Sequence, residues 1–181
     1  SNNATNPANS LALYRRTAGA SEPSSYTWTL STSNAAVGGM VAFQGANSST
    51  VVDVESGQST APALTHATPS VTTTTANTML VAAFDMTSSA SWTPPTGMTE
   101  AVDLASATVG SSSGICLEIA WQLQAAAGAT GIRTATASNN AGTGNACIVA
   151  PIIVLLPLKQ RRDGAAPSTG ARPSARPRHA D

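Results

Sequence analysis

The stretch TMLVAAFDM, residues 78–86, decides the fold because it is apolar on both faces of an extended chain. Successive side chains of a β-strand point to opposite faces of the sheet, so this stretch predicts a strand that is covered on both sides. One face receives Met79, Val81 and Ala83, and the other receives Leu80, Ala82 and Phe84. Such a strand belongs in the middle of a sheet with packing layers above and below it.

Other stretches also have the period of two that is typical of strands. Residues 25–31 and 115–123 alternate, which predicts two further strands. On residues 25–31 the apolar face carries Tyr26, Trp28 and Leu30, and we expect it to point inward. Residues 146–158 are apolar on both faces and predict a second strand inside a sheet. Residues 46–60 have the composition of a long loop, with room for a short strand at 50–54.

The spacing of turn residues points to one fold class. Clusters of Gly, Pro and Asn separate short runs rich in Thr, Val and Ser, and no helical period appears. We therefore predict an all-β fold, a two-sheet antiparallel β-sandwich of jelly-roll or immunoglobulin-like type with extended N- and C-terminal arms. The predicted division is an N-terminal arm at 1–10, the sandwich at 11–158 and a basic Pro/Ala/Arg-rich tail at 159–181.

Charge is sparse and unevenly placed. Charged residues make up 10% of the chain and the formal net charge is zero, which excludes a highly charged disordered chain. Residues 1–158 carry three Arg against seven acidic residues, whereas residues 159–181 carry six Lys and Arg against two acidic residues. The longest apolar run, 148–158, contains two prolines and is shorter than the roughly 20 residues that span a bilayer, so no membrane partner is expected.

Several short motifs of the body form a recognisable set. They are LYRRTA at 13–18, EPSSYTWT at 22–29, GGMVAFQG at 38–45, PSVTTT at 69–74, WTPPTGMTE at 92–100 and AAAGATG at 125–131. Together they resemble a Thr/Ser-rich β-sandwich module of bacteriophage virion proteins, among them tail, fibre and decoration proteins, and of bacterial surface proteins. The resemblance runs from about residue 11 to 158. It implies a structural or adhesive role and brings no catalytic residues with it.

The titratable residues do not suggest an enzyme. His66 has no Cys or acidic neighbour in the sequence, His179 lies in the tail, and no Gly-x-Ser-x-Gly motif is present. We therefore expect no catalytic residues, no metal and no other cofactor. Asp53 and Glu55, with Asn47 and Asp85 as further oxygen donors, could hold a calcium ion. Two exposed acids that solubilise a loop are the simpler interpretation.

Aromatic and sulfur-containing residues allow one ligand hypothesis. Trp92 lies beside two prolines in an expected loop, and with Asn47 and Asp53 it could form a platform for a host glycan. Trp28 and Trp121 each lie on the apolar face of an alternating strand, so both are expected in the core. Two cysteines are present, and they either form one disulfide or remain buried free thiols. These cysteines are Cys116 and Cys147.

The tail supplies the expected contacts between subunits. Its arginines lack the interleaved aromatic residues that stack on bases, so a nucleic-acid partner is not expected. A solvated chain end and an arm that lies on an acidic neighbouring subunit are the remaining interpretations, and we favour the second. The arginines concerned are Arg161, Arg162, Arg172, Arg176 and Arg178.

Two functions follow from these patterns. The first is a structural subunit on a virion surface or in another extracellular assembly, either capsid-decorating or tail-associated. Its partners would be further copies of itself and other virion or surface proteins. The alternative is a glycan-binding adhesion module that recognises a host glycan.

Overall fold

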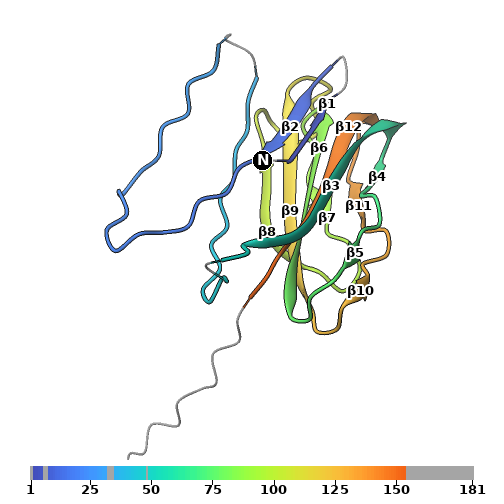
Figure 1. Cartoon of the computed structure of the whole chain (residues 1–181). Helices are drawn as coiled ribbons and strands as arrows, with labels where there is room; N and C mark the ends of the chain where they lie inside the picture. Colours follow the sequence, from blue (N-terminus) through green and yellow to red (C-terminus); the bar gives the residue numbers. More distant parts are fainter. Residues whose placement is uncertain (1, 6–7, 32–34, 48, 154–181) are drawn as a thin grey trace, which may run out of the picture.

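The chain is built from antiparallel strands. The structure is a computed structural model that describes residues 2–5, 8–31, 35–47 and 49–153. These ranges contain twelve strands and no helix, and each paired strand is antiparallel to its neighbour (Figure 1). The expected all-β fold is therefore confirmed. The strands are β1 (Asn2–Thr5), β2 (Ser10–Leu13), β3 (Val52–Ala63), β4 (Thr65–Ala67), β5 (Thr72–Thr73), β6 (Thr78–Thr87), β7 (Trp92–Thr93), β8 (Thr99–Ala105), β9 (Ile115–Gln124), β10 (Gly128–Ala129), β11 (Thr134–Ala137) and β12 (Gly142–Pro151).

The largest sheet has five strands in the order β3-β12-β6-β9-β8. Its middle strand is β6, which confirms the position predicted from residues 78–86. β12 lies between β3 and β6 and confirms the second strand inside the sheet. That strand ends at Pro151, and residues 154–158 of the expected strand lie outside the described part of the chain.

Three short strands, in the order β4-β11-β7, pack over one face of this sheet. β11 alternates exposed threonine with buried alanine, so only small side chains point from it into the core. Larger side chains from β6 and β7 fill the space between the layers. The core side chains on this face include Leu80, Phe84, Met86, Trp92, Ala135 and Ala137.

The opposite face is covered by chain from the N-terminal third. Residues 2–5, expected in an extended N-terminal arm, pair with residues 10–13 in the β1–β2 hairpin, which lies against β3 and β12. Leu11 of this hairpin belongs to a second apolar core, against which Val41 and Phe43 also pack. At Gly39 the backbone passes so close to the sheet that a Cβ atom there would lie 2.8 Å from Val102 Cγ1.

One expectation is wrong for residues 14–31, which are called the projecting segment below. The strand predicted at 25–31 is not formed, and Trp28 is 68% exposed although it was expected in the core. Figure 1 shows the segment in blue, standing away from the sheets. Alternation fixes which side chains share a face, but a strand also needs an edge that accepts its hydrogen bonds. None of the described strands pairs with this segment.

The region 46–60 corrects a second expectation. Instead of a long loop, the chain forms β3 from Val52 to Ala63 and pairs with β12 along its length. β3 is an edge strand in which the five consecutive residues 56–60 are Ser, Gly, Gln, Ser and Thr, so its apolar signal is weak.

None of the described residues belongs to a helix with the length and apolar character required to cross a bilayer.

Candidate functional site

Asn47 makes hydrogen bonds within its own turn. Its Oδ1 accepts hydrogen bonds from the backbone N–H groups of Ser49, at 2.8 Å, and Thr50, at 2.9 Å. Both partners follow within three residues, as in the local turns that Asn side chains stabilise. This geometry gives Asn47 a role in shaping the chain just before β3.

Asp53 likewise holds another part of the chain. Its carboxylate accepts hydrogen bonds from the backbone N–H of Thr74, at 2.7 Å, the N–H of Thr75, at 3.0 Å, and the Thr74 hydroxyl, at 2.5 Å. Burial on its own would raise the pKa of Asp53, but the hydrogen bonds from Thr74 and Thr75 outweigh it and lower the pKa. Asp53 therefore fastens the turn before β6 to the edge strand β3.

Replacing Asp53 with alanine is expected to destabilise the fold by roughly 1–3 kcal/mol at pH 7, because three hydrogen-bond donors lose a charged acceptor. The lowered pKa means that this contribution is present at neutral pH and disappears as the pH falls through the folded-state pKa, below 3.8. Urea unfolding at pH 7 and pH 3 measures the difference. Glu55→Ala, at an exposed position on the same strand, is the control, and equal losses in both variants would contradict the assignment.

Trp92 lies inside the protein. It is 6% exposed, and its ring contacts His66 edge to face with 5.6 Å between ring centroids, and Phe84 with 6.4 Å. Its backbone N–H donates to Asp103 Oδ2 at 3.0 Å. The ring therefore has no open face for a sugar, and Trp92, Asn47 and Asp53 make separate structural contacts without forming a common platform.

His66 is also a core residue. It is fully buried, its Nδ1 lies 2.5 Å from Thr60 Oγ1, and its Nε2 lies 3.1 Å from the Ala63 carbonyl oxygen. Burial lowers its pKa and so favours the neutral ring. Among the residues that the structure describes, no group of three or more His, Cys, Asp and Glu side chains is placed to hold a metal ion.

Glu118 is a buried acid that the sequence reasoning did not single out. It is fully buried between Phe84 and Asp103, its cross-strand neighbours, and neither carboxyl oxygen has a hydrogen-bond partner. Burial raises its pKa to about 8, and the nearby carboxylates of Glu100 and Asp103 add to the shift. The alternation of residues 115–123 predicts that Glu118 lies on the strand face opposite the large apolar side chains. Its burial, however, depends on the strands that cover this face.

Asp85 is the second buried acid, on the opposite face of the large sheet. Its Oδ1 accepts hydrogen bonds from the backbone N–H of Asn145, at 2.7 Å, and from Asn145 Nδ2, at 3.0 Å. Burial raises the pKa of Asp85 to about 6, and the hydrogen bonds from Asn145 limit the rise. Asn145 Nδ2 also donates to Asn9 Oδ1 at 3.1 Å, so this group ties the N-terminal hairpin to the sheet.

The two cysteines are free and buried. Burial raises the pKa of both thiols, that of Cys147 to about 12. Cys116 belongs to one core cluster and Cys147 to the other, on opposite faces of the large sheet. Of the two alternatives that the sequence left open, the structure has the free thiols.

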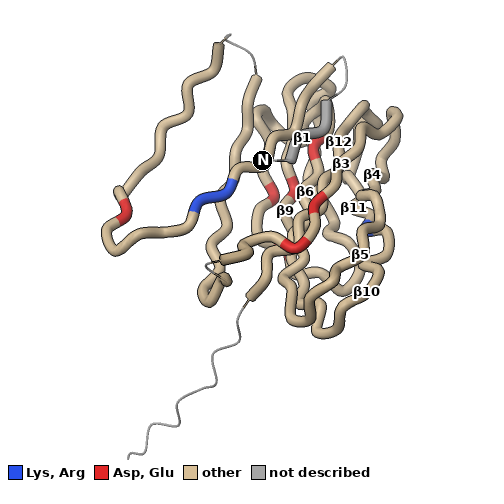
Figure 2. Tube along the Cα trace, viewed as in Figure 1, with Lys and Arg blue, Asp and Glu red and all other residues tan. Residues whose placement is uncertain are grey.

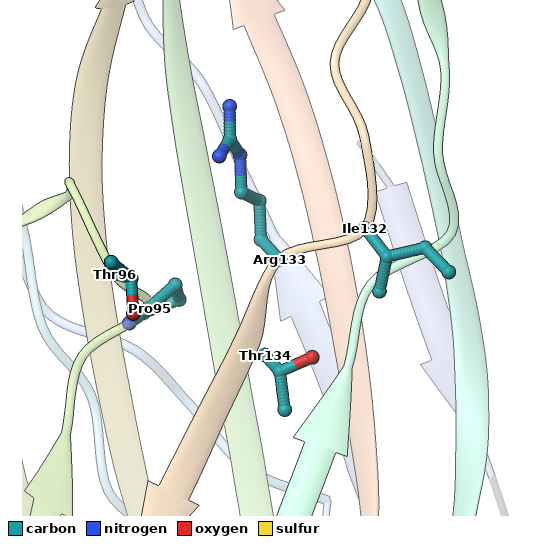
Figure 3. A pocket seen from close by; sticks show the side chains of 5 residues that line it. All are labelled: Pro95, Thr96, Ile132, Arg133 and Thr134. Carbon is teal, nitrogen blue, oxygen red and sulfur yellow. The ribbon is translucent and has the colours of Figure 1, made fainter.

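Two hollows open on the surface. One, of about 260 Å³, lies between the turn at Pro95 and Thr96 and the chain at residues 132–134, where Arg133 is its charged residue (Figure 3). The other, of about 290 Å³, is lined mainly by apolar side chains and is called the apolar groove below. Its lining residues are Val41, Ala42, Phe43, Met79, Ala101 and Trp121.

The projecting segment carries exposed aromatic side chains. Tyr14 is 66% and Trp28 68% exposed, and their rings face each other with 5.3 Å between centroids. Arg16 lies 5.6 Å over the ring of Tyr26, and its Nε is 3.5 Å from Glu22 Oε2. These contacts hold the two limbs of the segment together, yet its apolar surface remains in solvent.

The five tail arginines, from Arg161 to Arg178, lie outside the described residues, so their contacts stay a prediction. Of the other expected ligand and site residues, the structure gives each a structural partner within the chain. In comparisons with protein-family models, with curated proteins and with solved structures, nothing matches this chain.

Proposed function

We propose that the chain is a structural subunit of a virion or of another extracellular surface assembly, capsid-decorating or tail-associated, as the resemblance of its motifs implies. The finer architecture belongs to the same proposal: the layered body is a sandwich of jelly-roll or immunoglobulin-like type. No catalytic role is assigned.

The observation that carries the proposal is the exposed apolar surface of the projecting segment. Tyr14, Trp28 and Leu30 are each between 59% and 68% exposed, on a segment that stands off a well-packed body. Exposed apolar surface gathered in one place is typical of protein–protein interfaces. A subunit that binds its neighbours through such a segment would bury this surface only on assembly.

The charge distribution supports an assembly of like copies. Residues 37–153 contain one Arg and six acidic residues, whereas residues 159–181 have a net charge of +4. Complementary charge of this kind guides association and orients the partners. An acidic body and a basic tail on the same chain favour contacts between one copy and the next.

Sedimentation velocity of the full chain tests the proposal directly. We expect defined species above the monomer mass of 18.1 kDa, with the distribution shifting as the concentration rises. Negative-stain electron microscopy of the same sample would show whether the species have a regular shape. A chain that stays monomeric throughout the concentration series would contradict the proposal.

A truncation after Leu158 is expected to weaken this association at least tenfold, because it removes six cationic residues that the proposal assigns to contacts with acidic neighbouring copies. The circular dichroism spectrum and melting temperature should not change. Raising the salt concentration should weaken the association of the full chain and leave the association of the truncated chain nearly unchanged. Equal association of both chains at low salt would contradict the role of the tail in the interface. It would not contradict the assembly itself.

A further inference from the structure

Residues 25–31 have the sequence of a strand but no strand partner. Tyr26, Trp28 and Leu30 alternate with Ser and Thr, and the stretch forms neither a helix nor a strand. Among the described residues no backbone hydrogen bond joins this stretch to another part of the chain. Its N–H and C=O groups are therefore free to pair with an edge strand from elsewhere.

Among the described strands, β8 is an edge strand of the large sheet. β8 is hydrogen-bonded only to β9, and its residues Thr99, Glu100 and Ala101 are exposed. Both edge strands also make side-chain contacts within the chain: on β3, Gln58 Nε2 donates to the Ala67 carbonyl oxygen, and on β8, Asp103 Oδ2 accepts a hydrogen bond from the Trp92 backbone N–H. An unpaired edge such as β8 is a template for pairing with another chain.

The apolar groove borders this edge. Ala101 of β8 lines it together with Phe43 and Trp121, whose rings meet edge to face with 6.1 Å between centroids. A strand added beside β8 would place alternate side chains over this groove. An apolar groove accepts apolar side chains, and one face of residues 25–31 carries such side chains.

The charges that flank the two surfaces are of opposite sign, but the pairing stretch itself is uncharged. The projecting segment carries Arg15 and Arg16 against Glu22, whereas β8 carries Glu100 and Asp103, and Figure 2 shows basic residues on the projecting segment and acidic residues on the sheets. A β-bulge at Ala101 and acidic side chains are features that keep unsuitable strands from an edge. Residues 25–31 carry no charge, so they bring no like charge to the acidic edge of β8, and Arg15 and Arg16 lie outside the pairing stretch.

We propose that residues 25–31 of one copy add as a strand to the β8 edge of a second copy. Tyr26, Trp28 and Leu30 then lie over the apolar groove of that second copy. This inference rests on the proposed function, because it names the surface through which the copies assemble. Main-chain hydrogen bonds supply affinity in such strand addition, and the alternate side chains supply specificity.

A second copy fits better than the chain's own edge. The projecting segment stands apart from β8 of its own chain in Figure 1. Each copy also offers one such stretch and one β8 edge, so the exchange is either reciprocal in a two-fold pair or continues from copy to copy.

Cross-linking between differently labelled full chains tests the contact. One chain carries Thr29→Cys and the other Ala101→Cys, and a short bismaleimide joins them. The native thiols are fully buried, and the unsubstituted chain serves as the reagent control. A heterodimer band is expected for this mixture and not for Thr29→Cys mixed with Thr136→Cys, which is exposed on β11 in the other sheet.

A matched pair of substitutions tests the groove contact. Trp28→Ala is expected to weaken association of the full chain at least tenfold, because the largest apolar side chain of the added strand is lost. Thr27→Ala, on the opposite face of the same strand, is expected to change association less than twofold. Melting temperatures of both variants should match the parent, since both side chains are exposed.

The outcomes separate the two proposals. Full chains that assemble without the heterodimer band, and with Trp28→Ala behaving like Thr27→Ala, overturn the strand addition and leave the assembly function standing. A chain that carries both Thr29→Cys and Ala101→Cys and cross-links only within itself also overturns the strand addition. In that case the segment pairs with the β8 edge of its own chain. A full chain that never assembles overturns both.

Discussion

Raising the pH from 5 to 8 is expected to destabilise the folded chain by an amount on the order of 4 kcal/mol. Glu118 ionises near its ordinary pKa of 4.5 when the chain is unfolded, but its pKa in the fold is about 8. Between these values the unfolded chain releases a proton that the folded chain retains, so each pH unit costs about 1.4 kcal/mol of stability. The loss levels off above pH 8, where both states are ionised.

Asp85 adds a smaller loss in the same direction, between its ordinary pKa of 3.8 and about 6. Buried His66 acts in the opposite direction below its ordinary pKa of 6.5, because burial lowers its pKa and the unfolded chain then binds the extra proton. Urea unfolding followed by tryptophan fluorescence at intervals from pH 4.5 to 9 would show these contributions. Above pH 6.5, where Asp85 has finished titrating, the remaining slope belongs to Glu118.

Glu118→Gln is the decisive variant because it keeps the side-chain size and removes the ionisation. It should flatten the profile between pH 6.5 and 8 and be more stable than the parent at pH 8. Glu55→Gln, at an exposed position on β3, should keep the parental profile. A parent stability that stays constant or rises from pH 6 to 8 would contradict the burial of a neutral Glu118.

Trp92→Ala is expected to cost about 3–5 kcal/mol of folding free energy, because it empties a buried aromatic site in the core between the large sheet and the β4-β11-β7 strands. The ring also supports His66 and Phe84, its two aromatic neighbours. Urea unfolding followed by circular dichroism measures the loss without relying on tryptophan emission.

Trp28→Ala is the matched control for this prediction. The same change of residue removes a ring that is 68% exposed, so the loss should stay within about 0.5 kcal/mol. The two tryptophans should thus exchange the roles that the sequence suggested for them: Trp92 supports the fold, and Trp28 is available to a partner. Similar losses in both variants would contradict this assignment.

The alternation of residues 115–123 predicted correctly which side chains of β9 share a face. Leu117 and Ile119 lie in one core, and Cys116 and Ala120 lie in the other. The same pattern placed Glu118 beside Cys116, but it could not show that a covering layer would bury the carboxyl group. Burial is a property of the neighbouring strands, and these come from distant parts of the chain.

Asp53 and Asn47 show the same limit for the candidate site. Their oxygen atoms suggested a ligand because the sequence contains no sign of their hydrogen-bond donors, which are backbone N–H groups. The partners of Asp53 are 21 and 22 residues away, so only the folded chain brings them together.

From the sequence alone one could derive the all-β class, the two-faced strand at 78–86, the strand within the sheet that begins near residue 146 and the separation of charge between body and tail. These properties depend on composition and on the period of two, which are local. The tertiary structure decided that residues 25–31 stay unpaired, that Trp92 is enclosed and that Glu118 is buried without a partner. Each of these depends on which distant segment lies alongside, and hydrogen bonding and solvent exclusion act between segments that the local pattern does not connect.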